Sequence, residues 1–478
     1  MKKTNLTNDK PSPFTDEMLN QFRHKGDKLA DDVIDAFASQ YGSSIQELAE
    51  KLQNMIRMPD DDDILAVIKK YFPDSENIQQ ALETFFAEAV KLPDWADSKK
   101  LALGGKVFQD HLFTGFMILG CASLPICYVC RPDVKVLSFT RRLIDDAPKR
   151  LVETSQMVTD VLSTDGLKIQ DRELVGKGVQ SILKIRLIHA SVRHLLVHKE
   201  EMLAEHDHAS KVDPKNFLLA YVLDSVRDDC HWYGDSKPDV WSLEEDGIPI
   251  NKEALAETLL TFSFVILRGL SRIGVHLSKE QQDAYLHSWN IAGYVLGVDE
   301  AFLKEFSNYE NTEVIYKQIL QRRFGKTPDG ILLQDSLLDV FSDNASRLIP
   351  FGLSHILHVR RLARLVTSKL ISDDSYRALG LKLSLYDRFI RMLVWMGVRT
   401  FGWCVNQGWL RPLADYMFGR IAQTLWDWRA DFTDEQKAAE PNISHTHDKN
   451  GVCNPLIIPP HLIASSNLSN TVANETNT

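Results

Sequence analysis

Cysteine is scarce in this chain. Only six of its 478 residues are cysteines, and their spacing is irregular: Cys121, Cys127, Cys130, Cys230, Cys404 and Cys453. So few thiols at such spacings argue against a disulfide framework. Cys127 and Cys130 have CxxC spacing, but they lie inside an apolar run and no second pair follows. We interpret them as buried thiols, and a zinc or redox pair is the lesser alternative.

Positive charge is also in short supply. Lysine and arginine number 55 against 65 acidic residues, which gives a formal net charge of -10. Without a long basic stripe, we expect no nucleic-acid partner. The chain also lacks a glycine-rich phosphate loop, an alternating strand pattern and an internal repeat. The first residues, MKKTNLTNDKPSPF, are basic but precede no apolar stretch, so they predict no secretory signal and a cytoplasmic location.

What the chain does have is apolar residues at helical spacing. Hydrophobic residues make up 44% and charged residues 25%, a balance that favours a soluble folded protein. The periodicity predicts an all-α protein with a single large multi-helix domain. We expect an N-terminal helical extension over 1–90 with about its first 15 residues disordered, a helical domain over 91–432, and a flexible polar tail over 433–478.

One nearly uncharged segment, from Leu112 to Cys130, approaches the length of a membrane span. It contains glycine, serine, threonine and proline, and the chain around it is typical of a globular protein. We therefore interpret the segment as a buried core helix, which gives the same signal. Contact with a membrane surface stays open and is not predicted.

The most informative segment is KIRLIHASVR at 184–193. At helical period, Arg186, His189 and Arg193 share one face, at offsets of three and four residues. Their neighbours are almost all apolar, and a helix that is apolar on most sides is normally buried. Burying two arginines and a histidine is costly unless an anion or a metal meets them. The pattern therefore predicts a site, although a core histidine beside arginines in buried ion pairs would produce it too.

This segment is one of five that resemble, in the same order, the MpaB-type oxygenase family, which includes the latex-clearing (rubber oxygenase) proteins. The others are PDWAD at 93–97, Arg142-Leu143 followed by PKRLVET at 148–154, GIPIN at 247–251 leading to TLLTFS at 258–263, and WNIAGYVLGV at 289–298. The resemblance covers about residues 90 to 380. It implies an all-α fold with a b-type haem between helices, dioxygen as co-substrate, and oxidation or cleavage of apolar, often isoprenoid, substrates.

The resemblance gives the helix at 184–193 a specific role. His189 would be the proximal ligand of the haem iron, for which its imidazole must be neutral. Arg186 and Arg193 would disfavour a charged imidazole and pair with the haem propionates.

Arg150 and Thr154 match the family's Arg-x-x-x-Thr element and would hydrogen-bond dioxygen on the opposite side. The alternative is that Arg150 pairs with Asp146 and that Thr154 bonds back to a helix carbonyl. Latex-clearing members carry lysine just before this threonine, where this chain has Glu153. The resemblance then implies an open or water-filled distal position, with Glu153 as a candidate base near the substrate. The departure puts rubber cleavage in doubt and favours a smaller apolar substrate.

The sequence therefore predicts an oxidoreductase, a haem b-dependent oxygenase or dioxygenase that uses dioxygen and an apolar small-molecule or polymer substrate. A haem-binding sensor or carrier without turnover would use the same histidine face. A non-haem metal enzyme would instead use His194 and His198, with further histidines at 206, 208 and 231. However, the chain has no HExxH pattern, and His194 points about 140° away from His189 around the helix.

Overall fold

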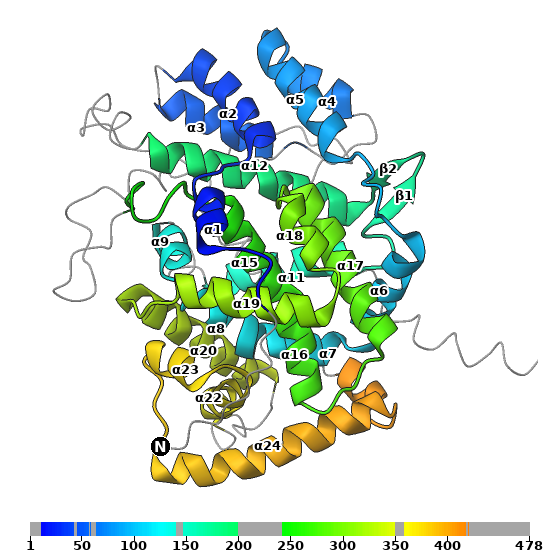
Figure 1. Ribbon diagram of the computed structural model, residues 1–478, viewed down its shortest axis with the longest axis vertical. Helices are drawn as coiled ribbons and strands as arrows, with labels where there is room; N and C mark the ends of the chain where they lie inside the picture. Colours follow the sequence, from blue (N-terminus) through cyan, green and yellow to red (C-terminus); the bar gives the residue numbers. More distant parts are fainter. Residues whose placement is uncertain are drawn as a thin grey trace, which may run out of the picture.

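The computed structural model describes residues 11–42, 45–56, 64–139, 147–198, 241–348 and 358–416, together with Met58 and Gly419 (Figure 1). Almost all regular structure in these ranges is helical, which confirms the all-α prediction. The predicted tail over 433–478 and the first ten residues lie outside the described ranges, and the three predicted segment boundaries stay predictions.

Four N-terminal helices form a layer at the top of Figure 1, drawn in shades of blue. They are α2 (Lys28–Tyr41), α3 (Ile45–Ile56), α4 (Ile64–Tyr71) and α5 (Glu76–Ala89), whereas α1 (Asp16–Arg23) lies lower in the view and contacts the helix at Lys252–Phe262. Their apolar faces bury residues such as Phe37, Leu48 and Phe85, which are inaccessible to solvent and belong to the main core. The predicted extension is therefore packed onto the helical domain.

The central helices begin at the entry segment PDWAD. They are α6 (Ser98–Asp110), α7 (Leu112–Ile118), α8 (Leu124–Cys127), α9 (Arg131–Phe139), α11 (Ala147–Leu162), α12 (Lys177–Val197), α15 (Lys252–Phe262), α16 (Phe264–Arg272), α17 (Lys279–Leu296), α18 (Glu300–Glu305) and α19 (Tyr309–Arg323). Local sequence sets several boundaries. Ser278 and Gln281 form a capping box at the start of α17, and Gly297 ends that helix with a left-handed backbone at φ 87°.

The C-terminal helices are α20 (Pro328–Leu348), α22 (Val359–Leu370), α23 (Asp373–Ala378) and α24 (Leu385–Asn406). Within the described ranges, the strands form one small hairpin, β1 (Lys168–Gln170) paired antiparallel with β2 (Glu173–Val175). Asp171 and Arg172 turn the hairpin with positive φ angles of 50° and 69°. The sequence did not predict this hairpin, which joins α11 to α12.

The apolar run from Leu112 to Cys127 is an uninterrupted helical segment in which a π-helical turn, η1 (Leu119–Ser123), lies between α7 and α8. The segment meets α6 at a bend of 82°. Lys252–Arg272 is also long and apolar enough to cross a membrane, but 78% of its apolar 18-residue stretch is buried inside the protein. Burial at this level is typical of core helices, so length and composition are weak grounds for a span in either segment.

Candidate functional site

The predicted site residues lie on a helical hairpin made of α11 and α12. The two helices pack together, and Ser181 Oγ near the start of α12 donates to Asp160 Oδ2 near the end of α11 at 3.0 Å. His189 is half-buried, about two turns along α12 from that bond. Glu153 and Thr154 are also half-buried, about two turns back along α11. The side chain of Arg150 lies outside the described residues, although its backbone is part of α11.

Arg186, one turn before His189, is held by the N-terminal layer. Its Nε and Nη2 donate to the two carboxylate oxygens of Asp27 at 2.6 and 2.8 Å, and its Nη1 donates to the carbonyl of Val295 at 2.8 Å. Both partners of this bidentate pair are buried. Burial would raise the pKa of Asp27, but the hydrogen bonds and charge of Arg186 outweigh it and keep that pKa below its usual value.

Arg193, one turn after His189, has the same kind of partner. Its Nε donates to Asp31 Oδ1 at 2.8 Å, and its Nη1 donates to the carbonyl of Ile250 at 2.8 Å. Asp31 follows Asp27 by one helical turn at the start of α2, so one end of this helix supplies a carboxylate to each arginine. Burial raises the pKa of Asp31, and the charge of Arg193 opposes that rise.

These contacts match the alternative that the sequence interpretation left open. Arg186 and Arg193 were predicted to pair with haem propionates, but the structure gives them the alternative, buried ion pairs with protein carboxylates. The physical reason is that α2 supplies the anions that two buried guanidinium groups require. Asp27 and Asp31 lie about 160 residues away in sequence, and a spacing pattern within one helix gives no indication of them.

The histidines of the non-haem alternative lie close together on α12. The rings of His194 and His198 are 4.5 Å apart, and His194 Nδ1 lies 3.8 Å from Asp35 Oδ1. The further histidines at 206, 208 and 231 lie outside the described residues. In the described part of the chain, the one group of three close enough to share a metal ion is Cys130, Asp133 and Glu257, which includes no histidine.

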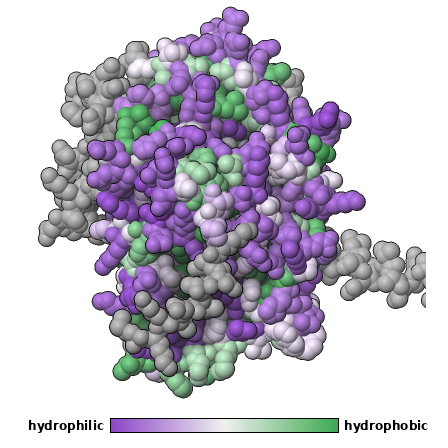
Figure 2. All heavy atoms as spheres, viewed as in Figure 1, coloured by the Kyte–Doolittle hydropathy of each residue, from purple (hydrophilic) through white to green (hydrophobic). Residues whose placement is uncertain are grey.

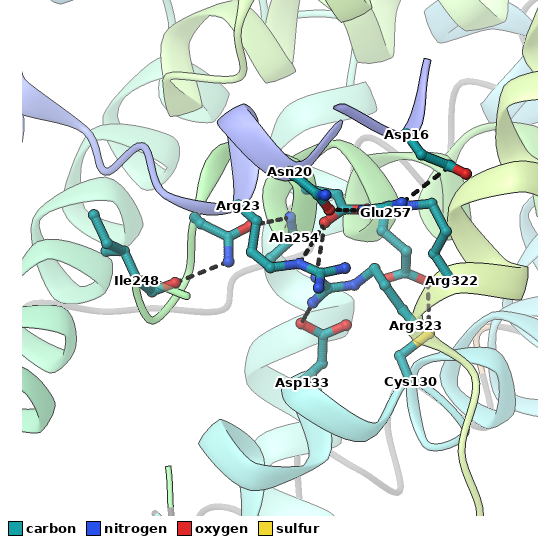
Figure 3. Close-up of polar contacts among 12 residues, drawn as sticks. Asp16, Asn20, Arg23, Cys130, Asp133, Ile248, Ala254, Glu257, Arg322 and Arg323 are labelled. Atoms are coloured by element: carbon teal, nitrogen blue, oxygen red, sulfur yellow. Dashed lines mark hydrogen bonds and ion pairs between the residues drawn. The ribbon is translucent and has the colours of Figure 1, made fainter. Parts of the chain in front are cut away.

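That group belongs to a second polar cluster, which the sequence interpretation missed (Figure 3). Glu253 and Glu257 lie one turn apart on α15 and are almost completely buried. Arg23 and Arg322 donate to the two oxygens of Glu253, at 3.1 and 2.9 Å. Arg323, also fully buried, pairs with Asp133 from α9. Two glutamates at helical spacing within an apolar helix were the signal available in the sequence.

The second cluster also explains the CxxC pair. Cys130 Sγ donates to Glu257 Oε1 at 3.2 Å, and Cys127 Sγ lies 3.4 Å from Thr261 Oγ1. Burial raises the pKa of both thiols well above the usual value, and the nearby Glu257 raises them further. They are buried thiols, as predicted. Burial, and then the charge of Asp133, also raises the pKa of Glu257 to about 8, so this carboxyl group is mainly protonated at neutral pH.

A cavity of about 240 Å³ lies between α6, the end of α11 and β1. Its lining includes Leu101, Gly105, Leu162, Ile169 and Ser288, and none of the predicted site residues. Its volume is below the usual range for small-molecule sites, roughly 300–1,000 Å³. The cavity therefore does not identify the predicted site.

Comparison with known proteins identifies the relationship. The profile described as "ER-bound oxygenase mpaB/B'/Rubber oxygenase, catalytic domain" matches residues 242–406. These residues are similar to the catalytic domain of the family that the sequence resembles. Rubber oxygenase from Streptomyces sp. (strain K30) is 20% identical over 264 residues, which are 55% of this chain and 53% of that protein. The chain thus spans about half the length of this relative.

The solved structure of latex clearing protein LCP in the closed state has the same fold. It matches with a TM-score of 0.55 at 16% sequence identity, and the match covers 85% of this chain and 91% of that chain. In this chain, the profile covers α15 to α24 and includes Glu253, Glu257 and Arg323. It begins after α12, so the roles of His189, Glu153 and Thr154 remain predictions from the resemblance.

Proposed function

We propose that this protein is a haem b-dependent oxygenase that acts with dioxygen on an apolar substrate. The observation that carries the proposal is the catalytic-domain match over 242–406, set within a fold shared with latex clearing protein. A rubber oxygenase acts, by its name, on an apolar polymer with oxygen. We extend only the substrate class to this chain.

The donor set on the α11–α12 hairpin fits a haem in part. His189 offers a single half-buried imidazole, the common protein ligand of haem iron. Thr154 and Glu153 add a hydroxyl and a carboxyl group on the neighbouring helix. Arg186 and Arg193 do not fit as partners of the haem propionates, because Asp27 and Asp31 already pair with them. The proposal therefore keeps the histidine and leaves the propionates to other residues.

The roles follow from the chemistry of these groups. The bound haem would supply the dioxygen chemistry that amino-acid side chains lack. A neutral His189 would hold it, and Thr154 would donate a hydrogen bond from α11. Glu153 would accept or return a proton at the substrate. Because this chain has a carboxylate where latex-clearing proteins have lysine, we propose a smaller unsaturated hydrocarbon as the substrate in place of rubber.

Absorption spectroscopy of the full chain, purified from cells supplied with haem precursor, tests the cofactor. We expect a Soret band and a pyridine haemochromogen spectrum of haem b, and loss of most bound haem in His189→Ala. His194→Ala, on another face of the same helix, is the matched control and should keep the band. Circular dichroism checks that both variants are folded. A full Soret band in His189→Ala, or stoichiometric zinc without iron, would contradict the assignment.

Oxygen uptake tests the reaction separately. We expect consumption of dioxygen with a short isoprenoid hydrocarbon such as squalene, and weaker consumption with polyisoprene. Thr154→Val should reduce the rate by about 10- to 1,000-fold, the range for removing one donor that stabilises developing charge, while haem content stays unchanged. Full haem loading without oxygen uptake on any apolar substrate would instead identify a sensor or carrier.

A further inference from the structure

The helix α24 carries an apolar face that no described part of the chain covers. The large hydrophobic side chains exposed on it are Leu385, Tyr386, Phe389, Met392, Leu393, Met396 and Trp403. Their exposed fractions run from 83% at Leu385 to 44% at Trp403. Exposed apolar surface on this scale is unusual for a soluble monomer and marks an interaction site.

The exposed positions form one stripe along the helix. Residues lie about 100° apart around a helix, so Leu385, Phe389, Met396 and Trp403 fall within a narrow sector. The opposite side packs against the protein, where Gly402 and Val405 are buried. The stripe itself contains no charged residue, and from Leu385 to Trp403 it extends roughly 27 Å.

The stripe continues beyond the end of α24. Trp409, Leu413 and Tyr416 are exposed by 69%, 47% and 66%, and the Trp409 ring contacts that of Trp403 at a centroid distance of 5.1 Å. In Figure 1 this helix lies along the lower edge of the molecule, and Figure 2 shows green, hydrophobic residues at the same edge. We call the ten exposed residues from Leu385 to Tyr416 the α24 face.

The exposed charges of α24 itself have one sign, and Asp415 lies beyond this helix. Arg388 and Arg399 are exposed and lie on the same flank, about 80–100° from Phe389 around the helix. The acidic residue of α24, Asp387, points into the protein and pairs with Arg361 at 2.7 Å. No carboxylate of α24 is therefore available to neutralise the arginine flank, and this flank is complementary to a negatively charged partner.

We propose that the α24 face lies in the interfacial layer of an anionic lipid membrane. An uncharged stripe of leucine, methionine and aromatic residues beside exposed arginines is typical of helices that lie in the membrane plane. Tyr386 lies near one end of the stripe and Trp403 near the other. Tyrosine and tryptophan side chains prefer this layer because their rings are apolar and carry one polar group. A second copy of the chain is the poorer partner, because it brings the same arginines and no carboxylate of α24. The proposal is independent of the haem.

Flotation of the full chain with lipid vesicles tests the proposal. We expect binding to vesicles of phosphatidylcholine with phosphatidylglycerol, and weak binding to phosphatidylcholine alone. The variant Phe389→Ser/Met396→Ser/Trp403→Ser should lose binding by about 100-fold or more, because three large apolar side chains no longer enter the lipid layer. Arg388→Gln/Arg399→Gln should weaken binding to the anionic vesicles about fivefold for each arginine and leave the neutral vesicles unaffected.

The matched control places serine at exposed apolar positions elsewhere, in Leu65→Ser/Tyr71→Ser on α4, and should bind like the unmodified chain. Quenching of tryptophan fluorescence by brominated lipid supplies a second measurement, which Trp403→Phe/Trp409→Phe should largely remove. Equal flotation of the serine variant and the unmodified chain would overturn the proposal. So would a dimer in solution that the same serine substitutions convert to a monomer, because a second copy would then be the partner.

Discussion

Two helices of nearly equal length, α12 and α24, place apolar residues in opposite ways. α12 has 21 residues and packs against α2, α11 and α17, so most of its apolar residues and both of its central arginines are buried. α24 has 22 residues and is covered on one side only, so its apolar residues are exposed on the other. In α12, protein carboxylates meet the buried charge, whereas on α24 the charge stays beside an open apolar stripe.

The comparison teaches that apolar content alone does not distinguish a core helix from a docking helix. What distinguishes them is the position of charge relative to the apolar residues. In α12, the arginines lie among the apolar residues. Burying the apolar residues therefore buries the arginines as well, and each buried guanidinium group requires an anionic partner. In α24, the arginines flank the stripe, which leaves the stripe free to meet another apolar phase. Four predictions test this distinction, from the largest expected effect to the smallest.

Removing the anion beneath α12 should have the largest effect. Asp27→Ala leaves the buried guanidinium of Arg186 without its bidentate partner, and we expect a loss of about 3–5 kcal/mol in the free energy of unfolding. Urea denaturation monitored by circular dichroism measures it. Asp32→Ala on the same helix is the control, because its pair with Lys28 is exposed to solvent and should contribute little. Equal losses in the free energy of unfolding for the two variants would show that the buried pair contributes no more to stability than the exposed pair.

Truncating one leucine on each helix compares the two apolar surfaces directly. Leu187 on α12 is 1% exposed, and Leu187→Ala should cost about 2–5 kcal/mol through lost burial and a residual cavity. Leu393 on α24 is 45% exposed, and Leu393→Ala should change the free energy of unfolding by no more than about 0.5 kcal/mol. Chemical denaturation without lipid measures both. A large cost at Leu393 would mean that the α24 face is covered in the free protein.

Local sequence predicts the fold class well because each helix carries its own signal. The apolar spacing in KIRLIHASVR predicted a helix with a buried charged face, and α12 has one. The start of α11 at Ala147, with Pro148 in its first turn, agrees with the sequence pattern. By contrast, the short hairpin of β1 and β2 was missed, since three-residue strands give no readable alternation.

The candidate site was harder to predict because its decisive contacts are distant in sequence. The arginines of α12 were recognised as needing anions, but the partners come from α2, and no local pattern connects the two helices. The cluster around Glu253 and Glu257 draws on α1, α9 and α19 as well as α15. Tertiary packing determines which residues pair with buried charges. The sequence therefore predicted that the buried arginines need anions, and only the structure identifies the carboxylates that pair with them.

The helix α15 extends the comparison to a buried acid whose pKa is raised. In the folded protein the pKa of Glu257 is about 8, above the usual 4.5, so the folded state binds its proton more tightly than the unfolded state. Its contribution to stability is complete below pH 4.5 and is lost as pH rises toward 8. Glu257→Gln, which stays neutral, should remove this decline, roughly 2 kcal/mol after allowing for the proton shared with Asp133. Thermal unfolding between pH 5 and 9 in both proteins measures it, and parallel profiles would contradict it.

The smallest expected effect comes from alanine substitutions at two glycines that lie on different faces of α24. A Cβ added at Gly397 would meet no atom within 4 Å, whereas one added at Gly402 would lie 2.2 Å from the carbonyl oxygen of Ile273. Gly397→Ala should therefore stabilise the protein by about 0.5–1 kcal/mol, the usual gain of alanine over glycine in an exposed helix. Gly402→Ala should destabilise it by about 1–3 kcal/mol, because the backbone of Ile273 must move. Melting temperatures of the two variants give the comparison. A destabilising Gly397→Ala would show that another part of the chain packs on the exposed face, and the membrane proposal would lose its open surface.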